Sequence, residues 1–217
     1  MVEVLAIRDI TAPAARSATA MKRLSAMVVA GLGLAGCTLT GPVQPDLSQA
    51  RVTVAPGIVF ALPPPAALER SVEASQLITA RYRHDTFVFE TRISVTPARL
   101  LVVGTDMLGR RAMTIEWTGH DLKVEAAPWV PTELRARNVI ADIMLLHWPE
   151  NAVRAGLAPP GSIRDDDLGH RMITVDGQDM IRIDRTAGLA GSWSGRWTYR
   201  NVGWGYDLDI QSTDAPP

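Results

Sequence analysis

The sequence predicts a mainly β protein with helices, of the α+β class. The expected architecture is a curved antiparallel sheet or half-open β-barrel with one helix packed on its concave face. Between about residues 75 and 126, apolar and polar residues alternate, which is typical of half-buried antiparallel strands. Apolar residues then recur every three or four positions over 131–148, as in a helix. Short alternating segments return after residue 172, so the helix interrupts a series of strands.

The segment before the first strand resembles an export signal. Met21-Lys22-Arg23 supplies two positive charges, and an apolar run ends at Gly36. This arrangement is typical of a secretory signal peptide, and the run is shorter than the ~20 residues of a membrane-spanning helix. We therefore expect a signal peptide at 21–36 and interpret residues 1–20 as a misassigned start.

Cys37 is the one cysteine of the chain and ends the sequence Leu34-Ala35-Gly36-Cys37. These residues resemble the lipobox of bacterial lipoproteins. That resemblance implies cleavage before Cys37 and a lipid on its sulfur, which would anchor the protein to a membrane. The alternative is an ordinary secretory signal with an incidental cysteine.

The residues after Cys37 bear on localisation and domain organisation. No aspartate follows the cysteine, and the resemblance then favours the outer membrane, facing the periplasm, over the inner membrane. Pro, Gly and Ser in residues 37–50 are typical of a tether. Residues 51–217 are long enough for a single domain with a substantial core.

The first half of this domain is expected to form a meander. Turn signals such as Thr96-Pro97 and Leu108-Gly109 separate alternating segments. In the second segment Phe87, Phe89 and Ile93 share one face. The segments expected to form strands lie near residues 75–83, 85–95, 98–105, 111–118 and 121–126.

The alternation breaks at Pro128. The helical spacing predicts an amphipathic helix over 131–148 that Pro149 stops. A second short helix is expected near 150–156, followed by a polar loop through Asp165-Asp166-Asp167. The last third then returns to strands, with a hairpin tip at Gly177. These strands are expected at 172–175, 180–184, 196–201 and 206–211.

No catalytic constellation is visible in the sequence. Gly191-Ser192-Trp193-Ser194-Gly195 has a tryptophan where a nucleophile elbow needs serine, so we interpret it as a glycine-rich loop. The histidines lack a metal-binding spacing, and His147 is interpreted as a cationic ring that suits the end of a helix. We therefore expect no enzyme activity, no cofactor and no metal. The four histidines are His84, His120, His147 and His170.

The net charge and the acidic residues bear on two kinds of partner, nucleic acids and calcium ions. The net charge of −1 gives no basic footprint for a nucleic-acid partner. Asp165-Asp166-Asp167 lacks the spacing of a calcium loop and is expected to be solvated. Asp142 lies between Ile140 and Ile143 in the predicted helix. It is either a solvent-facing or hydrogen-bonded carboxylate, or a polar contact at the mouth of a cavity.

The tryptophans also have two interpretations. Six are many for a chain with three Phe and three Tyr. They either pack in the core or at its rim, or line a cavity for acyl chains or meet a membrane interface. They are Trp117, Trp129, Trp148, Trp193, Trp197 and Trp204.

The stretch from Phe89 through Leu157 resembles the bacterial lipoprotein family DUF3261. The resemblance is carried by residues 102–111 (VVGTDMLGRR), 128–131 (PWVP) and the predicted helix ending in Trp148-Pro149. Members of that family often occur near gene clusters for aryl polyene lipids. The resemblance thus implies a lipoprotein of the cell envelope.

The strand–Leu-Gly–strand arrangement around residue 108 is also similar to that of the lipoprotein carriers LolA and LolB. That resemblance implies a half-open barrel capped by helices, with an apolar cavity for acyl chains and a protruding leucine that contacts the membrane. Met107 and Leu108 occupy the analogous turn. The proline that precedes Leu-Gly in LolB is absent here. The alternative is a hairpin whose leucine folds back on the core.

These features lead us to expect a non-enzymatic, membrane-anchored protein that binds or transfers lipids or lipoproteins through an apolar cavity. Burial of acyl chains, at ~25 cal/mol per Å², would drive binding. One alternative is a structural or assembly lipoprotein that docks onto an envelope export machine, and another is a cell-envelope hydrolase. The residues expected to line the cavity are Phe87, Phe89, Ile93, Leu101, Val103, Ile115, Ile140, Ile143 and Trp148.

Overall fold

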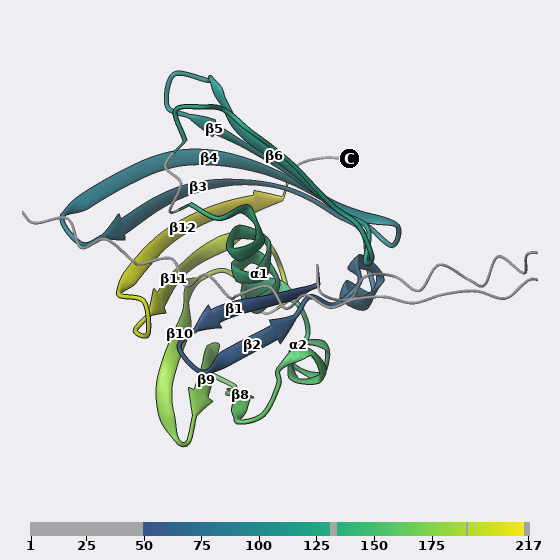
Figure 1. Cartoon of the computed structure of the whole chain (residues 1–217), viewed down its shortest axis with the longest axis vertical. Coiled ribbons are helices and arrows are strands. Elements are labelled where there is room, and N and C mark those ends of the chain that lie inside the picture. The colour runs from purple at the N-terminus through teal and green to yellow at the C-terminus, as the bar shows by residue number, and fades with distance from the viewer. Residues whose placement is uncertain (1–49, 131–133, 190, 215–217) are drawn as a thin grey trace, which may run out of the picture. The chain divides into compact units, whose positions relative to one another are not determined.

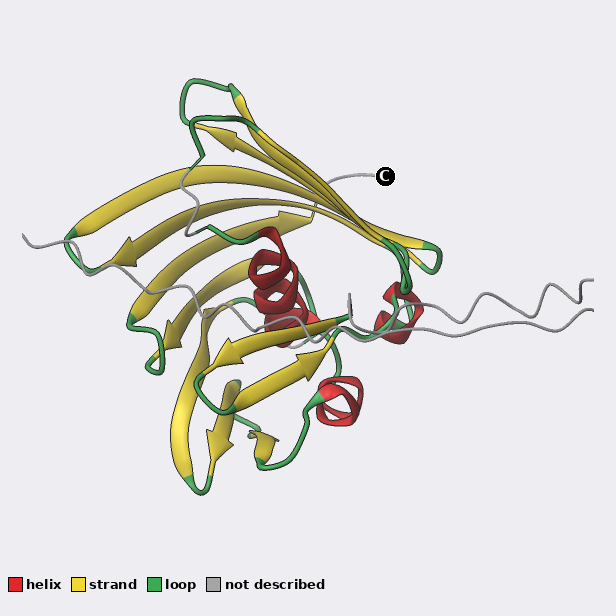
Figure 2. Ribbon diagram, viewed as in Figure 1, coloured by secondary structure: helices red, strands yellow, loops and turns green. Residues whose placement is uncertain are grey.

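The computed structural model describes residues 50–130, 134–189 and 191–214, and a ten-stranded antiparallel sheet dominates this part of the chain (Figures 1 and 2). The strands lie in the order β7-β6-β5-β4-β3-β12-β11-β10-β9-β8. Strands from the beginning and the end of the sheet, β3 and β12, pair at its centre. The strands are β3 (Val72–Tyr82), β4 (Asp85–Thr96), β5 (Arg99–Asp106), β6 (Arg111–Trp117), β7 (Leu122–Ala126), β8 (Gly161–Asp165), β9 (His170–Val175), β10 (Gln178–Ala187), β11 (Gly195–Asn201) and β12 (Tyr206–Asp214).

The sheet is curved but not closed. Within the described residues β7 and β8 are its two edges, and each pairs with a single neighbour. The predicted mainly β fold with a curved antiparallel sheet is therefore confirmed, and the sheet does not close into a barrel. Figure 1 shows the long strands β3 and β4 bending around the elements that lie on the concave side.

Five smaller elements accompany this sheet in the described part of the chain. Helix α1 (Ala136–His147) lies against the concave side, where its side chains contact β3, β11 and β12. A hairpin of β1 (Arg51–Ala55) and β2 (Ile58–Ala61) packs beside α1. The short 3-10 helix η1 (Pro65–Leu68) and helix α2 (Glu150–Gly156) complete this layer.

The alternation of residue types determines which side of each strand faces the core. On β4, Thr91, Ile93 and Val95 are buried, whereas Glu90 and Arg92, which alternate with them, are exposed. We call the buried side the core face and the opposite side the outer face. Rows of apolar residues cross the core face, such as Ile93, Val102, Ile115 and Val124, which are successive register partners from β4 to β7.

Close backbone contacts hold together the small elements that lie on the concave side of the sheet. The edge of β2 meets the end of α2, where the Ala158 N–H donates to the Val59 carbonyl oxygen (3.0 Å). A Cβ at Gly156 would lie 2.4 Å from the Ala61 oxygen, so glycine allows this approach. The predicted hairpin tip at Gly177 is also observed, because Asp176 and Gly177 both have positive φ between β9 and β10.

Two element predictions differ from the structure. The helix begins at Ala136 rather than at 131, because Arg135 has extended backbone angles and ends the regular helix on its N-terminal side; residues 131–133 lie outside the described part. The polar loop predicted between the short helix and Asp167 contains strand β8. Only Ile163 is buried in β8, so its charged, exposed residues gave no strand pattern, as is common for edge strands.

Candidate functional site

Part of the core face extends beyond the elements that cover it. Toward the turn between β3 and β4, core-facing side chains become less buried: Ile78 is 7 % exposed, whereas Phe87 is 43 % exposed. Phe87 pairs with Ala80, which pairs with Leu208 on β12. We call the part-exposed, uncharged residues of this region the apolar shelf. The shelf consists of Ala80, Tyr82, Phe87, Phe89, Tyr206 and Leu208.

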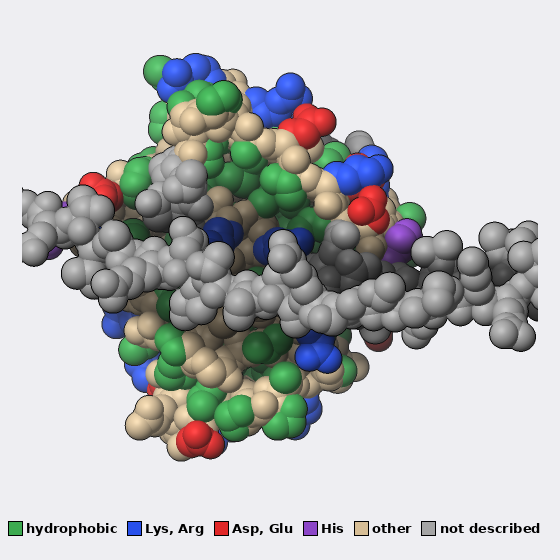
Figure 3. Space-filling view, in the orientation of Figure 1, with side chains coloured by type: hydrophobic (Ala, Val, Ile, Leu, Met, Phe, Trp, Pro, Cys, Tyr) green, Lys and Arg blue, Asp and Glu red, His purple; other side chains and the backbone are tan. Residues whose placement is uncertain are grey.

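The dimensions of the elements explain why this face is partly uncovered. With 12 residues, α1 is ~18 Å long and ~10 Å wide. Ten strands at ~4.8 Å spacing span ~43 Å. One helix therefore covers only part of the sheet. Figure 3 shows hydrophobic side chains on this face above the grey trace, over the region of β3 to β6 in Figure 1.

Most of the predicted cavity residues fill the space between the sheet and α1. Their side chains are at most 6 % exposed and pack together as core. Phe87 and Phe89 differ, because they lie on the shelf. The core residues are Ile93 and Ile115 on the sheet, Ile140 and Ile143 on α1, and Trp148 directly after α1.

Leu101 and Val103 lie on the outer face of β5. Their register partners on β4 are Ser94 and Arg92, whereas the core residue Ile93 pairs with Val102. The expectation that Leu101 and Val103 share the face of Ile93 is therefore corrected by the register. They point away from α1 and the shelf.

Met107 and Leu108 form the turn between β5 and β6. One oxygen of the Asp106 carboxylate accepts the N–H groups of Leu108 (3.0 Å) and Arg110 (2.9 Å), and the other accepts from the Arg110 guanidinium. Desolvation by itself raises the pKa of Asp106, but these hydrogen bonds and the charge of Arg110 together lower it. Leu108 is 81 % exposed and so does not fold back on the core. Cys37 lies outside the described residues.

A carboxylate and two phenols join α1 to the sheet at the inner border of the shelf. The hydroxyl of Tyr199 donates to Oδ1 of Asp142 (2.6 Å), and that of Tyr206 donates to Oδ2 (2.7 Å). The two tyrosine rings stack with centroids 5.9 Å apart. Asn201 donates to the Tyr206 hydroxyl (3.3 Å) and to the Val54 oxygen of β1.

Burial dominates the protonation of this cluster. It raises the pKa of Asp142 to about 7, although the hydrogen bonds from Tyr199 and Tyr206 act in the opposite direction. Burial, followed by the Asp142 charge, raises the pKa of both phenols well above their usual range. The phenols therefore stay protonated as donors, and Asp142 can exchange a proton near neutral pH.

An aromatic cluster surrounds the other end of α1. The His147 ring stacks on Trp193 (3.8 Å between centroids) and meets Trp197 edge-on (5.3 Å). Burial, with the charges of nearby arginines, lowers the pKa of His147 well below its usual range. His147 is thus neutral, not the expected cation. A ring protonated on Nδ1 can accept at Nε2 the hydrogen bond from the Gln76 amide (3.0 Å).

The C-terminus of α1 is closed by a side chain from β9. Arg171 donates to the carbonyl oxygens of Leu145 (2.5 Å) and Trp148 (3.0 Å), which lack helical partners. Its guanidinium also makes two hydrogen bonds to the Asp165 carboxylate. This arrangement supplies the positive charge that a helix C-terminus favours.

Sequence patterns alone missed the polar residues that bind α1. The alternation in β11 and β12 places Tyr199, Asn201 and Tyr206 on the core face. That signal was present in the sequence, but it does not reveal their contact with Asp142. The hydrogen-bonded interpretation of Asp142 is confirmed.

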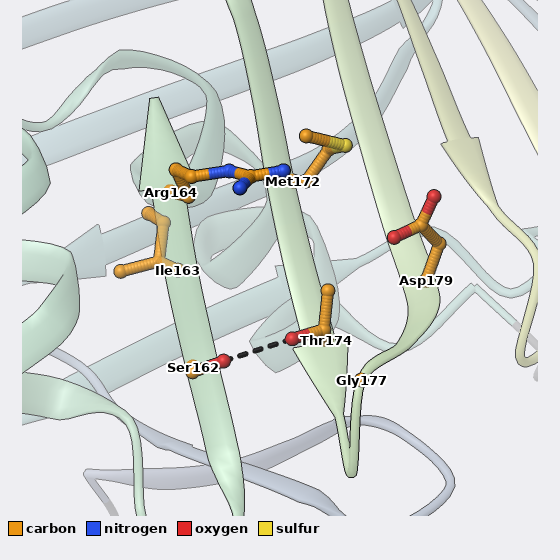
Figure 4. Close-up of a pocket in the computed structure, with 7 residues that line it drawn as sticks. All are labelled: Ser162, Ile163, Arg164, Met172, Thr174, Gly177 and Asp179. Carbon is orange, nitrogen blue, oxygen red and sulfur yellow. Dashed lines mark hydrogen bonds between the residues drawn. The ribbon is translucent and has the colours of Figure 1, made fainter. Parts of the chain in front are cut away.

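Two hollows formed by the described residues lie on the outer face. One, of about 310 Å³, lies beside β8, β9 and β10, where Ser162 and Thr174 share a hydrogen bond (2.8 Å; Figure 4). The other lies among ion pairs such as Arg200–Asp207. Polar and charged side chains of the face opposite to the shelf contribute to both hollows.

Two features are absent from the described residues. These residues contain no group of three His, Cys, Asp or Glu side chains placed to hold a metal ion. No helix among them is both long and apolar enough to span a membrane.

Comparison with known proteins identifies the family. Residues 73–214 match the model of a family described as protein of unknown function (DUF3261). No curated protein matches the sequence. The match runs from β3 to β12, covers more than half of the chain, and includes the Asp142 cluster and the aromatic cluster. The chain therefore belongs to the DUF3261 family of proteins of unknown function.

Proposed function

We propose that this protein binds acyl chains of lipids or lipoproteins on the apolar shelf and acts as a carrier rather than an enzyme. The observation that carries the proposal is the exposure of Phe87, 43 %, on the face that elsewhere forms the core. An acyl chain on the shelf would complete the burial that α1 provides over the rest of the sheet.

The chemistry of the shelf suits an alkyl chain. Its six residues span three adjacent strands, β4, β3 and β12, and the charged residues Asp85 and Asp106, the register partners of Tyr82 and Phe89, border them. Contact with such a surface is stabilised by ~25 cal/mol per Å² of apolar area removed from water and needs little polar recognition. The site is an open face, not the enclosed cavity between sheet and α1 that the sequence suggested, because core side chains fill that space.

We further propose that a lipid on Cys37 holds the domain at the outer membrane, facing the periplasm, and that the β5–β6 turn contacts the bilayer. The LolA/LolB-like interpretation supports this, as do the exposures of Met107 (58 %) and Leu108 (81 %). The turn lies at the same end of the sheet as the shelf, because Asp106 pairs with Phe89. Cargo could thus pass between the membrane and the shelf, in the export of lipids such as aryl polyenes.

A matched pair of variants tests the proposal. Phe87 and Val88 are neighbours on β4 with exposures of 43 % and 38 %, but they lie on opposite faces. Binding of a fluorescent fatty acid to the purified protein should weaken about tenfold in Phe87→Ser, since a buried aromatic ring contributes ~1.5–3 kcal/mol. Val88→Ser should bind like the wild type. Equal binding by both variants, or none by the wild type, would refute the proposal.

A further inference from the structure

We propose that Asp142 binds the head of the amphiphile on the apolar shelf, and that this head is a primary ammonium group, as in an alkylamine or an ethanolamine lipid. The inference rests on the proposed function, because the shelf supplies the contact for the apolar tail.

The position of Asp142 suits a head group. Asp142 is half-buried, and its carboxylate accepts a hydrogen bond from the hydroxyl of Tyr206, which belongs to the shelf. The row of register partners Phe87, Ala80 and Leu208 continues to Tyr199, the second donor to Asp142. From β4 to β11 this row crosses three strand spacings, ~14 Å. A tail along the row would therefore place its head at Asp142.

The charge of Asp142 has no protein counter-ion in the described part of the chain. Seven other aspartates there lie within 4 Å of a basic side chain, whereas Asp85, Asp166, Asp167, Asp176 and Asp214 form no such pair. The seven are Asp106, Asp121, Asp165, Asp179, Asp184, Asp207 and Asp209. Asp142 has only the two phenol donors. A buried carboxylate without a cation is costly. An ammonium group supplies both the missing charge and N–H donors for the remaining oxygen lone pairs.

Of the groups around Asp142, its own carboxyl is the one whose proton competes with a bound cation. From β11 and β12 it meets Tyr199 and Tyr206, whose pKa values are raised well above their usual range. From β3, Tyr82 is the register partner of Tyr206. Because the pKa of Asp142 is about 7, a cation competes with a proton below neutral pH. Binding of an amine should therefore strengthen as the pH rises through 7.

Calorimetric titration with decylamine, decanol and decanoate separates the head from the tail. At about pH 8 the wild type should bind decylamine about tenfold more tightly than decanol, the difference that a charge-assisted hydrogen bond makes. Asp142→Asn should lose this preference but retain decanol binding. Asp209→Asn, on the outer face and paired with Arg81, should behave like the wild type.

The outcomes distinguish this inference from the proposed function. Equal affinity of the wild type for all three compounds, or an unchanged preference in Asp142→Asn, would overturn the inference and leave acyl binding intact. No binding of any compound would overturn both. If Asp142→Asn does not fold, the wild type alone decides. Its affinity for decylamine, but not for decanol, should rise about tenfold between pH 6 and 8, and a flat profile would contradict the inference.

Discussion

Leu108 and Leu168 occupy the same position in two turns of the same design at opposite ends of the sheet. In each turn one oxygen of an aspartate, Asp106 or Asp166, accepts the leucine N–H and a second backbone N–H two residues later. A glycine with positive φ follows each leucine. The leucines are 81 % and 78 % exposed, but only Leu108 lies at the end that carries the shelf.

This pair gives a matched test of membrane contact. Leu108→Glu should reduce the association of the non-lipidated domain with phospholipid vesicles several-fold, because insertion of a leucine contributes ~1.5–3 kcal/mol. Leu168→Glu should have no such effect, although it introduces the same charge in the same type of turn. The measurement is co-sedimentation with vesicles. Equal losses in both variants would show that charge, and not the β5–β6 turn, controls association.

Arg171 should contribute strongly to stability. Its side chain is 11 % exposed, and its guanidinium joins Asp165 to the last carbonyl oxygens of α1. Arg171→Ala leaves these acceptors and a part-buried carboxylate unpaired, so we expect a loss of ~2–4 kcal/mol in the free energy of unfolding in urea.

Arg200→Ala is the control for Arg171. Arg200 pairs with Asp207 on the outer face, where both side chains are largely exposed, so its loss should cost at most ~1 kcal/mol. If the two variants are equally stable, the closure of α1 by Arg171 does not stabilise the fold.

The alternation of apolar and polar residues predicted which side chains face the core in strands with a single apolar side. In β4, Phe87, Phe89 and Ile93 share a face as predicted. In β5, the run Leu100-Leu101-Val102-Val103 is apolar throughout. The residue types therefore do not show which of these side chains face the core. The register with β4 decides which residues point inward, and no local pattern encodes that register.

The candidate site was predictable only in part. The helix and the inward direction of Tyr199 and Tyr206 follow from local periodicity. The contact of these tyrosines with Asp142 joins residues 57 and 64 positions apart, so it depends on how α1 lies across the sheet. The neutral state of His147 likewise follows from burial against Trp193 and nearby arginines, which its place at a helix end does not reveal.

Lipidation of Cys37 has its own test. Cells that express the full chain should incorporate labelled palmitate into the wild-type protein, and Cys37→Ser should abolish the label because the thioether needs the sulfur. The variant should also leave the membrane fraction for the soluble fraction. Labelling that persists in Cys37→Ser would exclude the lipobox interpretation, since the chain has no other cysteine.

Asp142 should make stability depend on pH in an unusual direction. The pKa of this carboxyl is raised in the folded state to about 7, above an unfolded value of ~3.9. Between about pH 4 and 7 the folded state therefore binds more protons than the unfolded state, and the contribution of Asp142 to stability falls as pH rises, by at most ~1.4 kcal/mol per pH unit.

His147 acts in the opposite direction, so a difference between variants isolates Asp142. The lowered pKa of His147 gives stability that is present above ~6.5, the unfolded pKa of histidine, and is lost as pH falls. Asp142→Asn keeps that effect but removes the carboxyl. Urea unfolding at about pH 5, 6 and 7 should thus show the variant gaining stability relative to the wild type as pH rises. A constant difference would mean that Asp142 is ionised throughout this range, with its pKa close to that of the unfolded chain.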